Sequence, residues 1–147
     1  MAVDAGLVQE FLIKGWDFSH AGEASCEIKN TLKQIGISAE IIRRVAIAAY
    51  EAEMNVVMYA HQGIMRCEID PDQIKITVED QGPGIADIDL AMQEGYSTAT
   101  PEMREMGFGA GMGLPNIKRN TDIFEITSIV GSGTKLTLVF RLSQNPQ

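Results

Sequence analysis

The sequence has few aromatic residues, no basic cluster and no long apolar run, and each scarcity excludes a class of protein. Aromatic residues make up 6% of the 147 residues, so the core has to consist mainly of aliphatic side chains. No apolar run approaches the roughly 20 residues that cross a membrane, and the N-terminus lacks the basic-then-apolar pattern of a signal peptide. We therefore expect a cytoplasmic protein that does not enter a membrane.

The net charge is −8, and the longest basic cluster is the pair Arg43 and Arg44. Proteins bind nucleic acids through clustered Lys and Arg side chains, so we expect no nucleic-acid partner. The two cysteines, Cys26 and Cys67, lie far apart, and neither histidine has a metal-ligand spacing. This argues against a structural zinc site and predicts two buried free thiols.

The apolar periodicity predicts one α+β domain over residues 1–147, with a mixed, mostly antiparallel sheet and helices on one face. No repeat or linker interrupts it. Ser19 and Ser38 are the expected N-caps of two successive helices, and Gly36 ends the first of them. The expected strands are 7–18, 64–69, 74–78, 123–130 and 134–141, and the expected helices are 21–34, 39–60, 88–95 and 114–121.

Glu51 and Asn55 lie four residues apart in the expected helix 39–60, so both side chains project from one face. A carboxylate and an amide oxygen suit a site for a magnesium nucleotide, because the amide oxygen is a hard ligand and the carboxylate can take a proton. The alternative is a solvated helix face. Glu53 points elsewhere on this helix, and we expect it to be solvated.

The run D-Q-G-P-G-I begins at Asp80, where an alternating strand ends. A carboxylate in an apolar pocket can accept a hydrogen bond from the amino group of adenine, and Gly82 and Gly84 let the backbone approach the base. The alternative is a plain turn. A later turn, G-S-G-T, ends at Thr134, whose hydroxyl could bond a base or a water beside Asp80.

A glycine-rich run, G-F-G-A-G-M-G, precedes the expected helix 114–121. Alternate glycines at a helix start expose several N–H groups, which form a phosphate nest. The spacing does not fit the dinucleotide fingerprint, and the Gly-Lys-Ser/Thr of the P-loop is absent. The alternative is a flexible loop without a ligand.

In this order and spacing, the motifs resemble the GHKL ATP-binding superfamily, whose members share E-x-x-x-N, D-x-G-x-G, a glycine-rich lid and a late G-T. The stretches D-I-D-L-A-M-Q-E-G-Y-S-T, G-F-G-A-G-M-G-L-P-N-I-K-R and D-I-F-E-I are similar to the anti-sigma-factor kinases of bacterial partner switching, the RsbT, RsbW and SpoIIAB group. In the lid the similarity is greatest to RsbT, whereas the inserted T-P-E-M-R-E-M resembles the longer lids of SpoIIAB-like members. The resemblance implies a Bergerat-type α/β sandwich.

The resemblance also implies residue roles. Glu51 would be the base that accepts the proton of a substrate hydroxyl, Asn55 would bind Mg²⁺, and Asp80 would bond the adenine amino group. Arg104 in the lid could reach the γ-phosphate or be solvated, and Lys118 and Arg119 could contact phosphate or complement the negative end of their helix. The other implied nucleotide-binding residues are Gly82, Gly84 and Thr134 near the base, and Gly109, Gly111 and Gly113 over the phosphates.

The implied function is a serine/threonine protein kinase and regulatory switch that uses ATP and Mg²⁺ and phosphorylates a STAS-domain antagonist protein. A sigma factor or a phosphatase would be its second partner. Two alternatives stay open: a binding module that holds ATP without transferring phosphate, and a histidine-kinase-type ATPase domain. The resemblance also leaves a monomer and a homodimer open.

Overall fold

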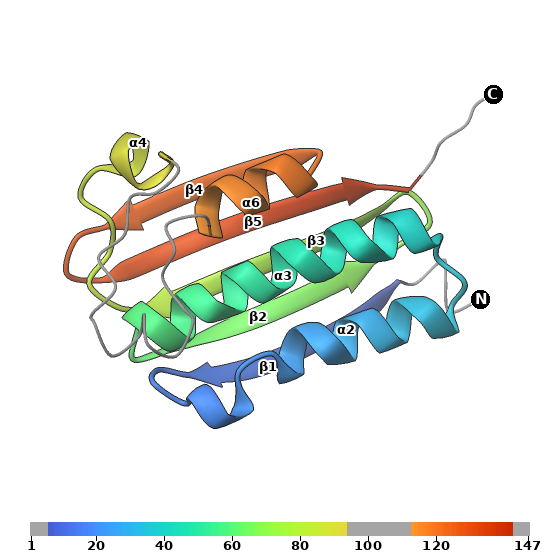
Figure 1. Cartoon of the computed structure of the whole chain (residues 1–147), viewed down its shortest axis with the longest axis horizontal. Coiled ribbons are helices and arrows are strands. Elements are labelled where there is room, and N and C mark those ends of the chain that lie inside the picture. The colour runs from blue at the N-terminus through green and yellow to red at the C-terminus, as the bar shows by residue number, and fades with distance from the viewer. Residues whose placement is uncertain (1–5, 94–112, 143–147) are drawn as a thin grey trace.

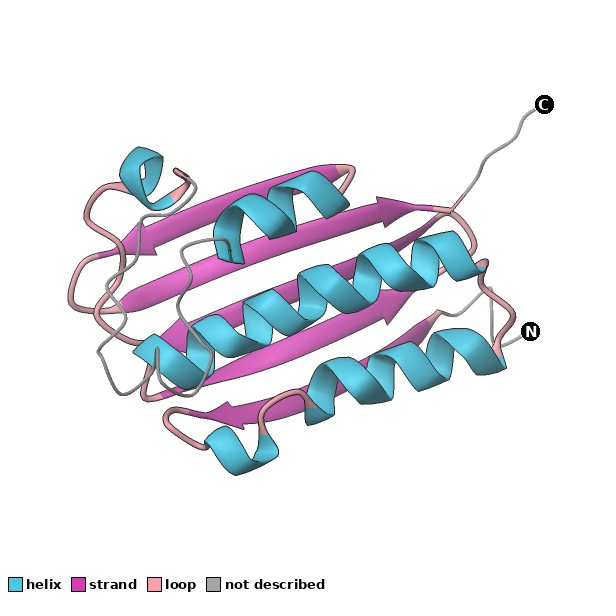
Figure 2. Ribbon diagram, viewed as in Figure 1, coloured by secondary structure: helices cyan, strands magenta, loops and turns pink. Residues whose placement is uncertain are grey.

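The computed structural model describes residues 6–93 and 113–142, which form one sheet with helices on one of its faces (Figures 1 and 2). Within these residues no helix is both long and apolar enough to span a membrane. In chain order the elements are β1 (Leu7–Lys14), η1 (Phe18–His20), α2 (Glu23–Gln34), α3 (Ala39–Tyr59), β2 (Gln62–Ile69), β3 (Gln73–Gln81), α4 (Ile88–Ala91), α6 (Gly113–Asn120), β4 (Ile123–Ile129) and β5 (Gly133–Arg141).

The strands lie in the order β1-β2-β3-β5-β4, and every neighbouring pair among the described strands is antiparallel. This confirms the predicted α+β class and both predicted hairpins. The last hairpin joins the sheet through β5, which pairs with β3, so that Thr77 lies opposite Thr137. This pairing brings the start of β5 beside the end of β3, although the two are far apart in the sequence.

The core lies between the sheet and the helices α2, α3 and α6, which Figure 1 shows in front of the strands. Alternate residues of the central strands point into it, as the two-residue period of a strand requires. From α3, small side chains allow the helix to lie close to the sheet. Fully buried core residues include Val45, Ala48, Ala49 and Ala52 of α3, Met65 of β2, Ile74 and Ile76 of β3, and Leu138 and Phe140 of β5.

The first strand is shorter than predicted: it ends at Lys14 and not at residue 18. Trp16 takes a left-handed backbone conformation with φ of 61°, which no extended strand allows. Its N–H donates to the carbonyl of Val57 in α3 over 2.6 Å, so the chain turns there onto the helix layer. The prediction of two buried thiols was half wrong, because Cys67 is buried but Cys26 lies on the exposed side of α2.

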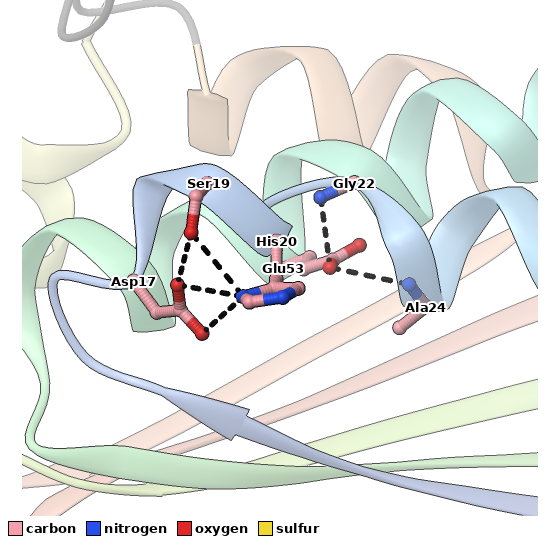
Figure 3. Close-up of polar contacts among 6 residues, drawn as sticks. All are labelled: Asp17, Ser19, His20, Gly22, Ala24 and Glu53. Carbon is pink, nitrogen blue, oxygen red and sulfur yellow. Dashed lines mark hydrogen bonds and ion pairs between the residues drawn. The ribbon is translucent and has the colours of Figure 1, made fainter.

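The start of α2 corrects two further predictions (Figure 3). Ser19 does not cap this helix; its hydroxyl donates to Asp17 in the preceding turn. The N-cap residue is Gly22, which has no side chain to accept a hydrogen bond. The carboxylate of Glu53 from α3 accepts the hydrogen bonds that a capping side chain would otherwise accept. Glu53 is therefore not solvated: it is 2% exposed and accepts from the N–H groups of Gly22, Ala24 and Ser25 at 2.9, 3.3 and 3.0 Å.

Candidate functional site

Asp80 stands near the C-terminal end of β3, half-buried, beside the first residues of β5. Its Oδ1 accepts a hydrogen bond of 3.0 Å from the backbone N–H of Thr134. Among the described residues, Asp80 accepts no other hydrogen bond with its carboxylate. Its second oxygen, Oδ2, therefore stays available to a ligand. Burial raises the pKa of Asp80, and the bond from Thr134 opposes that rise.

The two glycine turns beside Asp80 interlock. Gly84 has φ of 76°, and a Cβ there would lie 2.5 Å from the carbonyl oxygen of Ile129. The N–H of Gly82, which is buried, donates to the carbonyl of Ser132 over 3.3 Å, and that of Gly131 donates to Pro83 over 2.8 Å. The D-x-G-x-G turn and the G-S-G-T turn therefore form one unit around Asp80.

Ser128 on β4 belongs to this unit, and the sequence analysis missed it. Its hydroxyl accepts from the N–H of Ile85 at 2.7 Å and donates to the carbonyl of Gly133 at 3.2 Å. It also lies 2.9 Å from the hydroxyl of Thr134, so Thr134 serves Asp80 with its backbone N–H and Ser128 with its side chain. The sequence could have indicated Ser128, because it is a polar residue on the same face of β4 as Phe124 and Ile126.

Glu51 and Asn55 lie on one face of α3, as predicted, and both are half-buried. The first residue of α6, Gly113, lies against them: a Cβ on Gly113 would be 3.5 Å from Glu51 Oε1 and 3.8 Å from Asn55 Oδ1. The N-terminus of α6 and its positive dipole end therefore meet the carboxylate and the amide. This is the place where the phosphates of a nucleotide would find N–H donors and a hard oxygen ligand.

A second missed residue, Asn116, holds Glu51. Its Nδ2 donates to Glu51 Oε2 over 3.4 Å, and its Oδ1 accepts from Arg119 over 3.0 Å. Burial raises the pKa of Glu51, and the bond from Asn116 lowers it. The signal in the sequence was a polar residue three positions after Gly113, which places it on the same face of α6.

The end of α3 connects the two groups of residues. Glu51 and Asn55 lie in its second half, and Ala60, which caps it, contacts Gly82: a Cβ on Gly82 would be 3.0 Å from Ala60 Cα. The structure therefore brings Glu51, Asn55 and Gly113 together at one end of the site and Asp80, Gly82, Gly84 and Thr134 together at the other.

Three predicted residues, Gly109, Gly111 and Arg104, lie outside the described residues. Lys118 and Arg119 are in the last turn of α6, where cations complement the negative helix end. Arg119 also bonds Asn116, a contact that the sequence did not predict. In residues 6–93 and 113–142, no group of three or more His, Cys, Asp or Glu side chains is placed to hold a metal ion.

Comparison with known proteins agrees with this geometry. The model of the histidine kinase-like ATPase domain matches residues 17–140. The serine/threonine-protein kinase RsbT of Bacillus subtilis is 34% identical over 128 residues, which cover 84% of this chain and 88% of that protein. The anti-sigma F factors of Oceanobacillus iheyensis and Caldanaerobacter subterraneus are 27% and 32% identical, over 83% and 76% of this chain and 84% and 78% of theirs.

The chain therefore belongs to the histidine kinase-like ATPase domain family, and within it to the group that contains RsbT and the anti-sigma F factors. This is the family that the four motifs predicted. Membership in an ATPase domain family implies that this domain binds ATP.

Proposed function

We propose that this protein binds ATP and transfers its γ-phosphoryl group to a serine or threonine of a STAS-domain partner in a partner-switching system. RsbT, a serine/threonine-protein kinase by name, supports the reaction, and the anti-sigma F factors support regulation of a sigma factor. A sigma factor or a phosphatase is the second partner in this proposal, and the protein works in the cytoplasm.

The observation that carries the proposal is the position of Glu51. Its carboxylate is half-buried, held by Asn116, and next to the start of α6 and to Asn55. Burial raises its pKa, and a carboxylate with a raised pKa is a better proton acceptor near neutral pH than an exposed one. A module that only binds ATP could dispense with a base at this point.

The chain has groups that fit ATP at both ends of the site. Asp80 Oδ2 would accept from the adenine amino group, while Thr134 N–H occupies Oδ1. The N–H groups at the start of α6 would bond phosphate oxygens, and Asn55 Oδ1 would hold Mg²⁺. When bound, Mg²⁺ neutralises phosphate charge, which is the main requirement of phosphoryl transfer.

In the proposed reaction the substrate hydroxyl oxygen forms a bond to the γ-phosphorus of ATP, and the bond from that phosphorus to the bridging oxygen breaks. ADP leaves with the electron pair. Glu51 takes the hydroxyl proton, and Asn116 keeps the carboxylate directed at the start of α6. Positioning and charge neutralisation supply most of the rate in such transfers, so one base suffices.

The test is incubation with γ-³²P-labelled ATP and purified STAS-domain proteins encoded by the same genome. We expect labelled phosphoserine or phosphothreonine with the wild-type protein, and no label with Glu51→Gln, although this variant still binds ATP. The matched control is Glu40→Gln, an exposed glutamate in the first turn of α3. Equal transfer by Glu51→Gln would remove Glu51 from the role of base.

The anti-sigma F factor relatives favour a second function, ATP-dependent binding of a partner without transfer. In that case calorimetry would detect ATP-dependent association with a sigma factor, and no STAS-domain protein would be labelled. The histidine-kinase-type alternative predicts a phosphoryl group that acid removes, whereas phosphoserine and phosphothreonine survive acid. One labelling experiment with an acid wash therefore separates the three.

A further inference from the structure

Among the described strands, β1 has one edge that pairs with no other strand. The strand order places β1 at one border, where β2 pairs with only one of its two sides. In Figure 1 this border runs along the bottom of the view, beside α2. An edge strand presents a row of backbone N–H and C=O groups that another extended chain can pair with.

A groove of about 720 Å³ follows this edge between β1 and the first turns of α2. Its floor includes the strand from Glu10 to Lys14, and its wall is formed by Glu23, Ala24, Cys26 and Glu27 of α2. The wall is fixed in place, because Glu53 of α3 holds the first N–H groups of α2. The groove is therefore preformed, which lowers the entropic cost of binding.

The charges of the groove are mainly negative. His20 Nδ1 lies 2.9 Å from the carboxylate of Asp17, and Arg66 pairs with Glu10 at 2.7 Å. Glu23 and Glu27 lie four residues apart on one face of α2, and neither forms an ion pair with any described residue. Two like charges at this spacing repel each other, so a cation placed between them gains from both. Lys14 is a cation at the end of β1, on the face of the strand that carries Val8 and Leu12.

On the other face of the edge strand, apolar and charged side chains alternate: Val8, Glu10, Leu12 and Lys14. Val8 and Leu12 point away from the helices and are 52% and 59% exposed. Leu12 lies opposite Ile64 of β2, which is 49% exposed. Trp16 follows the strand and is 50% exposed. The rings of Trp16 and Phe18 contact each other edge to face. Exposed aromatic and aliphatic side chains beside a strand edge are typical of binding surfaces.

We propose that the β1 edge docks an extended segment of a partner protein in which basic and apolar side chains alternate. Paired to β1, such a segment directs its basic side chains to the helix side, where their stems cover Phe11 and their ends meet Glu23 and Glu27. Its apolar side chains cover Val8 and Leu12 on the opposite side. This surface is separate from the nucleotide site and does not depend on phosphoryl transfer.

The charges favour this occupant over a second copy of the chain. In a symmetric dimer through β1, the same surface would lie on both sides of the interface. Such a dimer would gather the unpaired carboxylates of Glu23 and Glu27 from both copies at one interface. Accumulating like charge at an interface is unfavourable, whereas a basic segment neutralises it.

The experiment uses an acetylated, amidated peptide of alternating Lys and Val, and a matched peptide of alternating Glu and Val. Trp16 is the single tryptophan of the chain and follows β1 by two residues, so its fluorescence should report binding at this strand. We expect the Lys peptide to shift the emission and the Glu peptide to leave it unchanged. Salt should weaken the binding, because the contacts are charged. A Lys peptide with alternate N-methyl groups, which cannot pair with an edge strand, should not bind.

The variant that tests the acidic wall is Glu23→Gln with Glu27→Gln, which removes two exposed charges and keeps the helix. We expect it to bind the Lys peptide about tenfold more weakly, since exposed charge pairs contribute up to about 1 kcal/mol each. The control is Glu40→Gln with Glu125→Gln, two exposed glutamates elsewhere, which should bind like the wild type. Unchanged affinity in the wall variant, equal binding of the N-methylated peptide, or a homodimer that the peptide does not dissociate would each overturn the proposal.

Discussion

The side-chain amide of Asn116 donates to the carboxylate of Glu51, with 3.4 Å between Nδ2 and Oε2. Arg119 donates to the other end of the same amide over 3.0 Å, and this contact fixes which end of Asn116 faces Glu51. The residue that we propose as the base is therefore positioned by a short chain of contacts within α6, and not only by α3.

Asn116→Ala should raise the pKa of Glu51, because it removes the hydrogen bond that favours the charged carboxylate while burial continues to raise it. Loss of activity on acidification should then begin at a higher pH, and transfer near neutral pH should fall about tenfold, equivalent to about 1.4 kcal/mol in the barrier. The measurements are the pH profile of transfer and an NMR titration of the Glu51 carboxyl carbon.

The matched control for that variant is Asn120→Ala on the same helix, which leaves the contact with Glu51 intact. Asn116→Asp should raise the pKa of Glu51 as well, because a second carboxylate repels the first. An unchanged titration of Glu51 in Asn116→Ala would contradict the positioning role even if no substrate had been found.

Asp80→Asn should lose ATP binding in calorimetry, because an amide cannot offer two acceptor oxygens. It should nevertheless be as stable as the wild type, or more stable, near neutral pH without nucleotide. Burial raises the pKa of Asp80 in the folded state, so the folded protein binds the proton more readily than the unfolded chain. The stability that wild-type Asp80 contributes therefore rises as the pH falls.

The measurement is the difference in thermal midpoint between Asp80→Asn and the wild type at a series of pH values. The advantage of the variant should be largest near neutral pH and should shrink as the pH falls through the raised pKa of Asp80. A difference that grows on acidification would contradict the role given to burial.

Gly84→Ala should destabilise the protein by about 2–4 kcal/mol, since it adds a left-handed backbone penalty to a clash with a rigid neighbour. The added Cβ would lie 2.5 Å from the carbonyl oxygen of Ile129. Gly131→Ala is the control: Gly131 has φ of 85°, but nothing lies within 4 Å of its Cβ position. It should lose only about 1 kcal/mol. Urea unfolding measures both, and equal losses would show that the contact with Ile129 is unimportant.

Glu53→Ala should destabilise the fold by about 2–4 kcal/mol, because three N–H groups at the start of α2 lose their acceptor in a buried place. Glu53→Gln should lose about 1–2 kcal/mol, since one oxygen remains and the favourable charge at the helix start is gone. Urea unfolding measures both, and the exposed Glu40→Ala serves as the comparison. A Glu53→Ala variant as stable as the wild type would mean that water satisfies these groups.

Local pattern in the sequence was enough for the elements. The strand alternation around Ile74 and Ile76, the Ser38 cap and the helix that carries Glu51 and Asn55 were all predicted, because each depends on residues close in the chain. The motif order was enough for the family. The prediction failed at Trp16 and at Glu53, where the conformation depends on α3 packing against residues about 30–40 positions earlier in the chain.

The sequence by itself determined that Glu51 and Asn55 share a face and that Asp80 begins a glycine turn, because helix and turn geometry operate over a few residues. Only the tertiary structure decided that Thr134 holds Asp80, that Asn116 holds Glu51 and that Glu53 caps α2. Those contacts join residues 28 to 65 positions apart. Strand pairing and helix packing bring them together, and no local pattern encodes either.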